Sequence, residues 1–170
     1  DGQYHCWNCD ASGNVYTFLT EAIHAPTLSD PQTNHYKAIA ADRRGIPQRL
    51  FKDLEFAYDQ SRDLWILPVR NARGSICNLR TWRPGQKVFG TAGLSSQLWL
   101  MDRLKPEGPI YIAEGEWDAM VLLHLLEKTG SHASVLAVPG ASIFADNFAE
   151  KLSGRDVHLV YDNDGASERG

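Results

Sequence analysis

Acidic side chains directly follow two short apolar runs in the C-terminal half of the sequence. Glu114 follows the run 110–113, and Asp162 and Asp164 follow the run 157–161. If both runs are strands of one open parallel sheet, their carboxyl ends face the same crevice and the three carboxylates lie together. Neighbouring carboxylates repel one another unless a cation neutralises them, and oxygen ligands of this kind suit Mg²⁺ or Mn²⁺. The spacing therefore predicts a divalent-metal site for phosphoryl chemistry.

A single acid at any of these positions has a simpler explanation. Carboxylates at strand–helix junctions commonly cap the helix that follows, and for one residue that alternative would be preferred. The expected convergence of three carboxylates favours the metal site instead. Glu116 is different, because it falls at the start of a predicted helix and is expected to face solvent, where its charge favours the helix dipole.

The elements that must position these acids form an alternating pattern. Strands are predicted at 110–114, 134–138 and 156–161, with helices at 116–129 and 142–152 between them. This alternation predicts a parallel sheet with right-handed crossovers. The inner face of the first helix is predicted to comprise Ala119, Met120, Leu122, Leu123 and Leu126.

A pattern with a period of two precedes this unit and predicts a small antiparallel sheet. Strands are predicted at 56–58, 64–70, 75–83 and 87–89, with turns at 71–74 and 83–86. Arg80 and Trp82 fall on one face of a strand, where they suit phosphate pairing and base stacking with a nucleic-acid strand. The alternative is that Trp82 belongs to the core and the arginines face solvent, and this segment by itself favours that alternative.

Fewer elements are predicted elsewhere. A helix is predicted from Val15 to His24 with Asn14 as its cap, followed by a polar linker at 27–34. A second helix is predicted from Tyr36 to Arg44. Residues 90–108 are expected to form a connector with one helical turn.

Composition limits the function classes. The chain has 170 residues, 43% of them apolar, and a net charge of −4. No apolar run approaches the ~20 residues that span a bilayer, and no signal peptide is seen. The charge is uneven, since residues 60–105 have a net of +6 and residues 106–170 a net of −7. A basic region beside an acidic one suits a polyanion groove next to a metal site, although for most of these charges a solvated face is the simpler explanation.

The three cysteines form no convincing disulfide framework, which predicts a reducing, cytoplasmic setting. Cys6 and Cys9 form a Cys-x-x-Cys pair, which is typical of one half of a zinc ribbon. Zinc requires four ligands, so the chain either begins inside a zinc ribbon or carries an unliganded remnant. A well-formed zinc site is therefore predicted only for a longer protein.

Three motifs together resemble the TOPRIM domain shared by bacterial-type primases, topoisomerases and some nucleases. They are Ile110-Tyr-Ile-Ala-Glu-Gly-Glu-Trp-Asp118, Ala137-Val-Pro-Gly140 and Leu159-Val-Tyr-Asp-Asn-Asp164. Further segments narrow the resemblance to DnaG-type primases. Residues 5–18 resemble the last zinc knuckle and the next helix, residues 67–74 the opening of the basic part, and residues 86–89 its lysine strand. The Glu-Gly-Glu-Trp-Asp form is typical of phage and plasmid primases and primase–helicases.

The resemblance implies a fold class and three regions. An α+β N-terminal part with a small antiparallel sheet is expected before an α/β TOPRIM domain, whose parallel sheet is flanked by helices. The regions are a zinc-ribbon remnant and helix at 1–26, the basic part of an RNA-polymerase core at 27–108, and TOPRIM at 109–170. Compared with the family, half of the ribbon and the last strand and helix of TOPRIM are missing, and Ser167 stands where glycine is common.

The resemblance also implies roles for the acids. Asp162 and Asp164 correspond to metal ligands that hold Mg²⁺ or Mn²⁺, and Asp118 corresponds to a further ligand. Glu114 is expected to organise the metal or to accept a proton. The bound cations would bridge attacking and leaving oxygens and offset developing charge.

The basic and aromatic residues receive roles in the same way. Arg80 and Lys87 match the ridge that guides the template or the triphosphate, and Arg70 and Arg83 are further candidates. Trp117 and Tyr161 are expected to be packing residues. The expected partners are a single-stranded DNA template, ribonucleoside triphosphates and a replicative helicase, in cis or in trans, with no membrane.

The implied activity is template-directed synthesis of short RNA primers, and a fragment of this kind is expected to be weakly active or inactive. Two alternatives remain. A TOPRIM nuclease or topoisomerase-like enzyme would use the same acids to cut phosphodiesters, although no domain with a nucleophilic tyrosine is indicated. A non-catalytic module would bind single-stranded DNA or a helicase, and its binding would persist when the acids are neutralised.

Overall fold

The computed structural model describes most of the chain from Gly45 onward and short pieces before it. The described residues are 3–5, 7, 10, 12–14, 17–19, 21, 45–59, 61–94, 96–140 and 146–162. The predicted linker at 27–34 and the predicted helix from Tyr36 to Arg44 lie outside them. Among the helices described, none has the length and apolar character needed to cross a bilayer.

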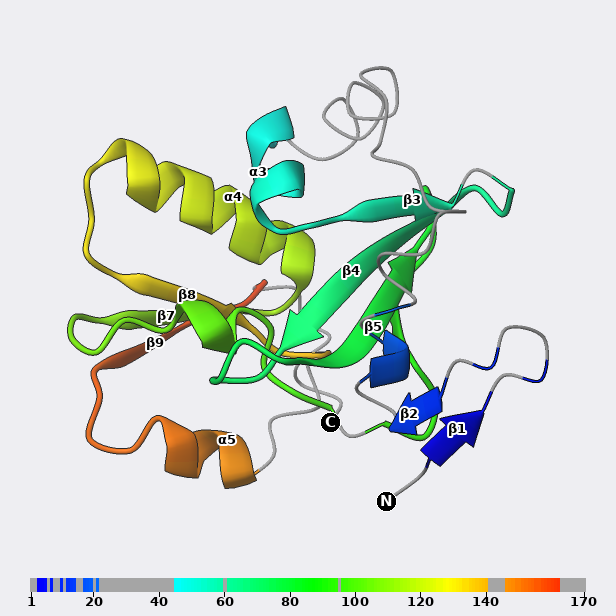
Figure 1. Cartoon of the computed structure of the whole chain (residues 1–170). Helices are drawn as coiled ribbons and strands as arrows, with labels where there is room; N and C mark the ends of the chain where they lie inside the picture. Colours follow the sequence, from blue (N-terminus) through cyan, green and yellow to red (C-terminus); the bar gives the residue numbers. More distant parts are fainter. Residues whose placement is uncertain are drawn as a thin grey trace, which may run out of the picture.

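The first large sheet is antiparallel, as predicted (Figure 1). Its strands are β3 (Ala57–Asp59), β4 (Leu64–Arg70), β5 (Ile76–Trp82) and β6 (Phe89–Gly90), in that order. The turn between β4 and β5 forms because the Asn71 carboxamide oxygen accepts the N–H groups of Arg73 and Ser75 at 2.9 and 3.2 Å. Gly74 adopts a φ of 80°, which suits glycine.

The strand predicted at 87–89 is shorter than expected and is shifted along the chain to Phe89–Gly90. The cause is local. The carbonyl of Gln86 accepts the indole N–H of Trp82 at 3.0 Å, so the chain folds over Trp82 before it begins to pair with β5. Lys87 is therefore exposed in the segment before β6.

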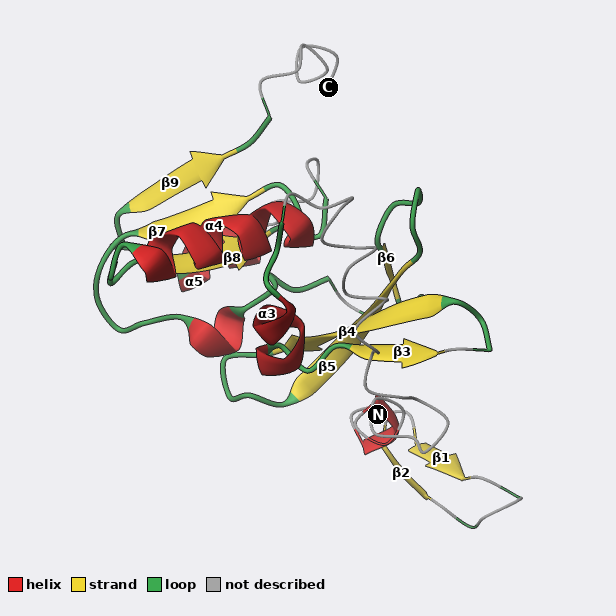
Figure 2. Ribbon diagram, turned by 90° about the horizontal axis from the view of Figure 1, so that it is seen from above, coloured by secondary structure: helices red, strands yellow, loops and turns green. Residues whose placement is uncertain are grey.

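The second large sheet is parallel and carries the acidic motif. Strand β7 (Ile110–Ala113) lies between β8 (Ser134–Ala137) and β9 (Val157–Val160). Helices α4 (Glu116–Lys128) and α5 (Asp146–Lys151) lie on opposite sides of this sheet, and β9 is the edge strand farther from the antiparallel sheet (Figure 2). This arrangement confirms the predicted α+β part followed by a parallel, TOPRIM-like sheet.

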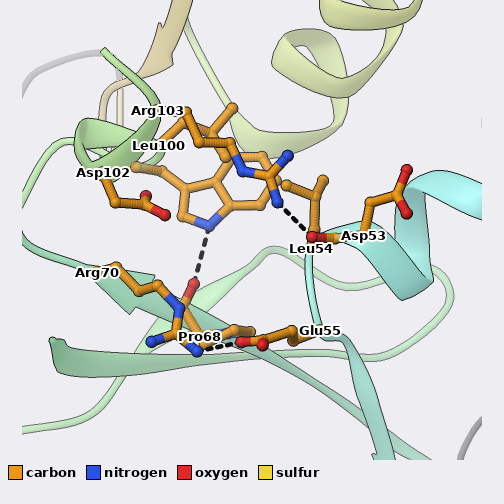
Figure 3. A pocket seen from close by; sticks show the side chains of 9 residues that line it. Asp53, Leu54, Glu55, Pro68, Arg70, Leu100, Asp102 and Arg103 are labelled. Carbon is orange, nitrogen blue, oxygen red and sulfur yellow. Dashed lines mark hydrogen bonds and ion pairs between the residues drawn. The ribbon is translucent and has the colours of Figure 1, made fainter. Parts of the chain in front are cut away.

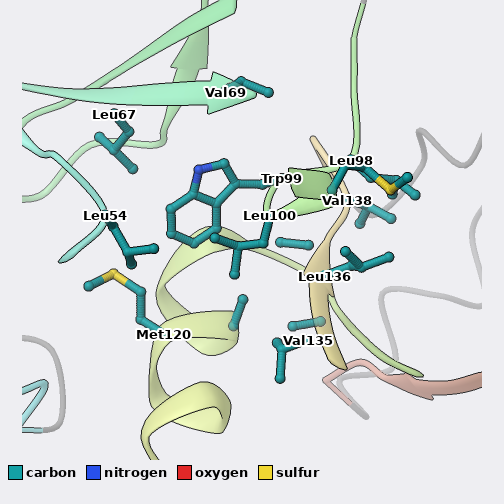
Figure 4. Close-up of a cluster of buried hydrophobic side chains, with 14 of the residues drawn as sticks. Leu54, Leu67, Val69, Leu98, Trp99, Leu100, Met120, Val135, Leu136 and Val138 are labelled. Carbon is teal, nitrogen blue, oxygen red and sulfur yellow. The ribbon is translucent and has the colours of Figure 1, made fainter. Parts of the chain in front are cut away.

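Trp99 joins the two sheets. Its backbone pairs with Ala137 at the carboxyl end of β8, and its indole N–H donates to the carbonyl of Pro68 on β4 at 3.0 Å. The indole lies among Leu54, Leu67 and Leu100 in the centre of the core (Figure 4). The core therefore continues from one sheet to the other.

Two helical segments flank this junction. The predicted turn in the connector is the 3₁₀ helix η1 (Met101–Arg103). Helix α3 (Gln48–Asp53) was not predicted, although Leu50, Phe51 and Leu54 have the spacing of a buried helical face. Its six residues were too short to stand out from the sequence pattern.

The N-terminal piece packs on the outer face of the antiparallel sheet. Strands β1 (Gln3–His5) and β2 (Ser12–Asn14) form a hairpin, and residues 17–19 and 21 are helical. Asn14 caps this segment as predicted, because its side-chain oxygen accepts the N–H of Thr17 at 3.0 Å. Leu19 is buried against Ala57, Ile76 and Leu79.

Candidate metal and nucleic-acid site

Glu114 and Asp162 follow neighbouring strands and lie close together. Residues Ile110–Ala113 of β7 pair in parallel with Val157–Val160 of β9, so both strands end at one edge of the sheet. The backbone N–H of Asp162 donates to the Glu114 carboxylate at 3.3 Å. The adjacency on which the sequence argument depended is therefore present.

Asp118 lies on the first turn of α4 and faces the same region. A Cβ added to Gly115 would come within 3.8 Å of the Asp118 Oδ2 atom, which places this carboxylate beside the turn that follows Glu114. Asp118 and Asp162 line one hollow together with apolar side chains of α4 and β9. The first turn of the helix thus brings Asp118 to the same hollow as Asp162.

The electrostatic environment at this edge of the parallel sheet is negative. Partial burial and the negative charge of Glu114 both raise the pKa of Tyr161. Tyr161 itself packs against the core, as predicted. Hard oxygen donors of this kind fit Mg²⁺ or Mn²⁺.

The full predicted ligand set is only partly described. Asp164 lies outside the described residues. Within them, no group of three acidic, histidine or cysteine side chains is close enough to form a ready metal site. The metal-binding roles of Glu114, Asp118, Asp162 and Asp164 therefore stay predictions.

The expectation that Glu116 faces solvent was wrong. Its side chain is 4% exposed and forms an ion pair with Arg80, whose side chain is 5% exposed. The second amino group of Arg80 donates to the carbonyl of Gln97 at 3.2 Å. Glu116 is buried because the antiparallel sheet covers the first turn of α4, an arrangement that the local sequence pattern does not reveal.

Burial has a clear effect on Arg80. Removal of the guanidinium from water lowers its pKa to about 10. A direct contact between Arg80 and a phosphate would require this ion pair to open. The nucleic-acid role of Arg80 stays a prediction, and its structural role is the ion pair with Glu116.

Trp82 and Trp117 pack against each other beside this ion pair. Their ring centroids are 4.6 Å apart at an interplanar angle of 65°. Trp82 is 1% exposed and belongs to the core, as the alternative held. The same alternative expected solvent-facing arginines, which is wrong for the buried Arg80. Trp117 also contacts Phe51 and Phe56, which confirms the packing role expected for it.

The other basic candidates lie in two places. Lys87 and Arg83 are exposed, and Arg83 donates to the carbonyl of Arg62 at 3.2 Å. Arg70 lies at the end of β4, where it forms an ion pair with Glu55 and donates to the carbonyl of Gly74 at 2.7 Å.

Arg70 also lines a polar hollow between α3, β4 and η1 (Figure 3). The candidate acids Glu114, Asp118 and Asp162 do not line this hollow. Arg70 is therefore not brought together with them. Cys6 and Cys9 lie outside the described residues, and zinc binding by this pair stays a prediction for a longer protein.

Comparisons with known proteins give matches among solved structures. Protein-family models and curated protein sequences gave no match. The primase fragment of the bacteriophage T7 primase–helicase aligns with 20% identity and a TM-score of 0.60, covering 99% of this chain and 74% of that one. A DNA primase domain from Pseudomonas aeruginosa aligns with 15% identity and a TM-score of 0.65, covering 91% and 63%.

The chain has the fold of a DnaG-type primase domain. A DnaG primase catalytic domain bound to single-stranded DNA gives the same result, with 17% identity, a TM-score of 0.62, and coverage of 89% of this chain and 64% of that one. Because all three identities are 20% or lower, these structural likenesses show the fold alone.

Proposed function

We propose that this chain is the catalytic part of a DNA primase, which makes short RNA primers on single-stranded DNA with Mg²⁺ or Mn²⁺. The observation that carries the proposal is the placement of Glu114 and Asp162 at the ends of adjacent strands, within a DnaG-type fold. Support also comes from similar structures, because one contains primase domains in a complex with a DNA polymerase, an RNA/DNA hybrid and dTTP, and another is a DnaG primase catalytic domain bound to single-stranded DNA. The proposal implies a cytoplasmic protein that works with a replicative helicase.

The acids divide the chemistry between them. Asp162, Asp164 and Asp118 would hold the divalent cations, and Glu114 would organise them or accept the proton of the attacking 3′-hydroxyl. Bound cations would offset the charge that develops on the attacking and leaving oxygens. The Asp162 N–H donates to one oxygen of Glu114 at 3.3 Å, which keeps this carboxylate beside the end of β9.

The basic residues act on the polyanion. Lys87 and Arg83 are exposed and suit contacts with template or triphosphate phosphates. Arg70 lies farther along β4 and is a weaker candidate, because Glu55 already neutralises it. Arg80 would contribute to the site indirectly, through its ion pair with Glu116 at the start of α4. Zinc binding by Cys6 and Cys9 is proposed only for a longer chain that would supply the other ligands.

The direct test is metal binding. The variant Asp162→Asn with Asp164→Asn should lose most of its Mn²⁺ binding in titration calorimetry, because neutral amides replace two of the anionic ligands. Asp156→Asn is the matched control, since Asp156 is an exposed acid just before the opposite end of β9. Unchanged Mn²⁺ binding by the double variant would refute the metal site.

A second assay addresses the reaction. The chain is incubated with single-stranded template, labelled ribonucleotides and Mn²⁺, and template-dependent short products are expected. Degradation of the single-stranded DNA in the absence of ribonucleotides would show a nuclease instead. The same double asparagine variant should abolish the products, while Asp156→Asn should retain them.

A further inference from the structure

The ion pair between Arg80 and Glu116 connects the two halves of the molecule at the start of α4. Arg80 comes from the middle of β5, and its guanidinium contacts both Glu116 and the carbonyl of Gln97. Both charged side chains are almost completely buried. A buried pair of this kind adds little net stability, because the cost of desolvation offsets most of the attraction. Its main effect on the molecule is then to fix the positions of the two segments that it joins.

That effect falls on the candidate acids. Glu116 is two residues after Glu114 and two before Asp118, so the ion pair fixes the short segment that carries both. Within this segment the N–H of Ala119 donates to the carbonyl of Gly115 at 3.0 Å, which closes the first turn of α4. A shift of Glu116 would move the strand end and this helical turn together.

We infer that Arg80 and Glu116 are positioning residues, which anchor the start of α4 to β5 so that Glu114 and Asp118 face the candidate metal site. Arg80 also withdraws Glu116 from that site, because the carboxylate is committed to the guanidinium. The inference rests on the proposed function, since it assigns the ion pair to the same acidic site. It differs from a direct phosphate contact by Arg80, which would leave Glu116 unpaired.

The chain contains a matched control for this pair. Arg49 of α3 and Glu127 near the other end of α4 form an ion pair at 2.5 Å, with side chains 51 and 39% exposed. This pair also attaches α4 to the rest of the molecule, but it is far along the helix from Glu114. Replacement of both members by methionine changes the net charge equally in the two cases.

The experiment compares Arg80→Met/Glu116→Met with Arg49→Met/Glu127→Met. Each double variant removes one positive and one negative charge, so the net charge is the same in both. Thermal unfolding first confirms that both variants are folded. The first readout, taken without metal, is the amide resonance of Asp162 and of Ala119 in ¹⁵N–¹H spectra, because these N–H groups report the position of Glu114 and of the first helical turn.

The second readout is Mn²⁺ affinity by calorimetry. For Arg80→Met/Glu116→Met we expect shifted Asp162 and Ala119 resonances and a loss of affinity of roughly 10- to 100-fold, as when groups that orient metal ligands are removed. The Arg49→Met/Glu127→Met variant should match the wild type in both readouts. Wild-type resonances and affinity in the first variant would overturn the inference.

The two readouts separate the inference from the proposed function. If the wild type fails to bind Mn²⁺, the proposed metal site is wrong, and the amide resonances still decide whether the pair positions Glu114. If the double methionine variant does not fold, Glu116→Asp replaces it, because aspartate keeps the charge and shortens the reach to Arg80. The same resonances should then shift, and wild-type resonances would again overturn the inference.

Discussion

Replacement of Trp99 by phenylalanine should destabilise the protein by about 3–5 kcal/mol, because Trp99 joins the two sheets. The indole is 2% exposed, and its N–H donates to the buried carbonyl of Pro68. Loss of that donor leaves a buried acceptor unpaired, which costs about 1–3 kcal/mol. The smaller ring loses about 1 kcal/mol of apolar burial. It also leaves a cavity of up to about 40 Å³, worth about 1 kcal/mol if it does not collapse.

Urea denaturation followed by far-ultraviolet circular dichroism measures this loss. The free energy of unfolding should fall while the transition stays single, since the buried cluster includes residues from both sheets. The midpoint of thermal unfolding should fall by roughly 6–20 °C for a chain of this size. Trp7→Phe is the control, because Trp7 is 93% exposed and should cost almost nothing. Equal effects of the two substitutions would refute a shared core centred on Trp99.

Three further outcomes are expected. Arg80→Met alone should destabilise the chain by about 3–5 kcal/mol in urea denaturation, because Glu116 is left buried and unpaired. The further substitution Glu116→Met should recover most of this loss, and a double variant that recovers none of it would contradict the prediction. The pKa of Tyr58 is raised from 10.0 to about 12, mainly by the hydrogen bond to Asp63 and to a smaller extent by burial. The folded state therefore holds this proton more tightly, so stability should fall as the pH rises from 10 to 12, and Tyr58→Phe should make the fall shallower. Lys87→Ala should lower the slope of log affinity for single-stranded DNA against log salt by about 0.7 per lost phosphate contact, and an unchanged slope would remove Lys87 from the interface.

The regular elements were largely predictable because their periodicity is local. The run Leu64–Arg70 is a strand with the predicted bounds, and the helix predicted at 116–129 is observed at Glu116–Lys128. Their buried faces repeat at the spacing that a strand or helix imposes. Helix α3 escaped prediction because six residues contain too few turns for a periodic signal. The shift of the strand predicted at 87–89 also escaped, since it depends on the indole N–H of Trp82 and the carbonyl of Gln86.

The candidate site was predictable only in part for a related reason. Strand alternation places Glu114 and Asp162 at one edge of a parallel sheet, and the observed pairing of β7 with β9 agrees. Which acids turn toward that edge depends on contacts between distant segments. The charge pattern alone indicated an exposed Glu116 at a helix start, and only the packing of β5 against α4 shows that it is buried.

Glu114, Glu116 and Asp118 therefore illustrate how one arginine can divide an acidic motif. Glu114 directly follows a strand and Glu116 begins a helix, so the backbone changes direction between them and their side chains need not face the same way. Arg80 takes Glu116 into the interior, where a carboxylate without a counter-ion would be strongly disfavoured. Trp82 and Trp117, which pack against each other beside this ion pair, exclude water from it. Because this ion pair is neutral overall, it adds no net charge beside Glu114 and Asp118, the two acids that the proposed function assigns to the metal site.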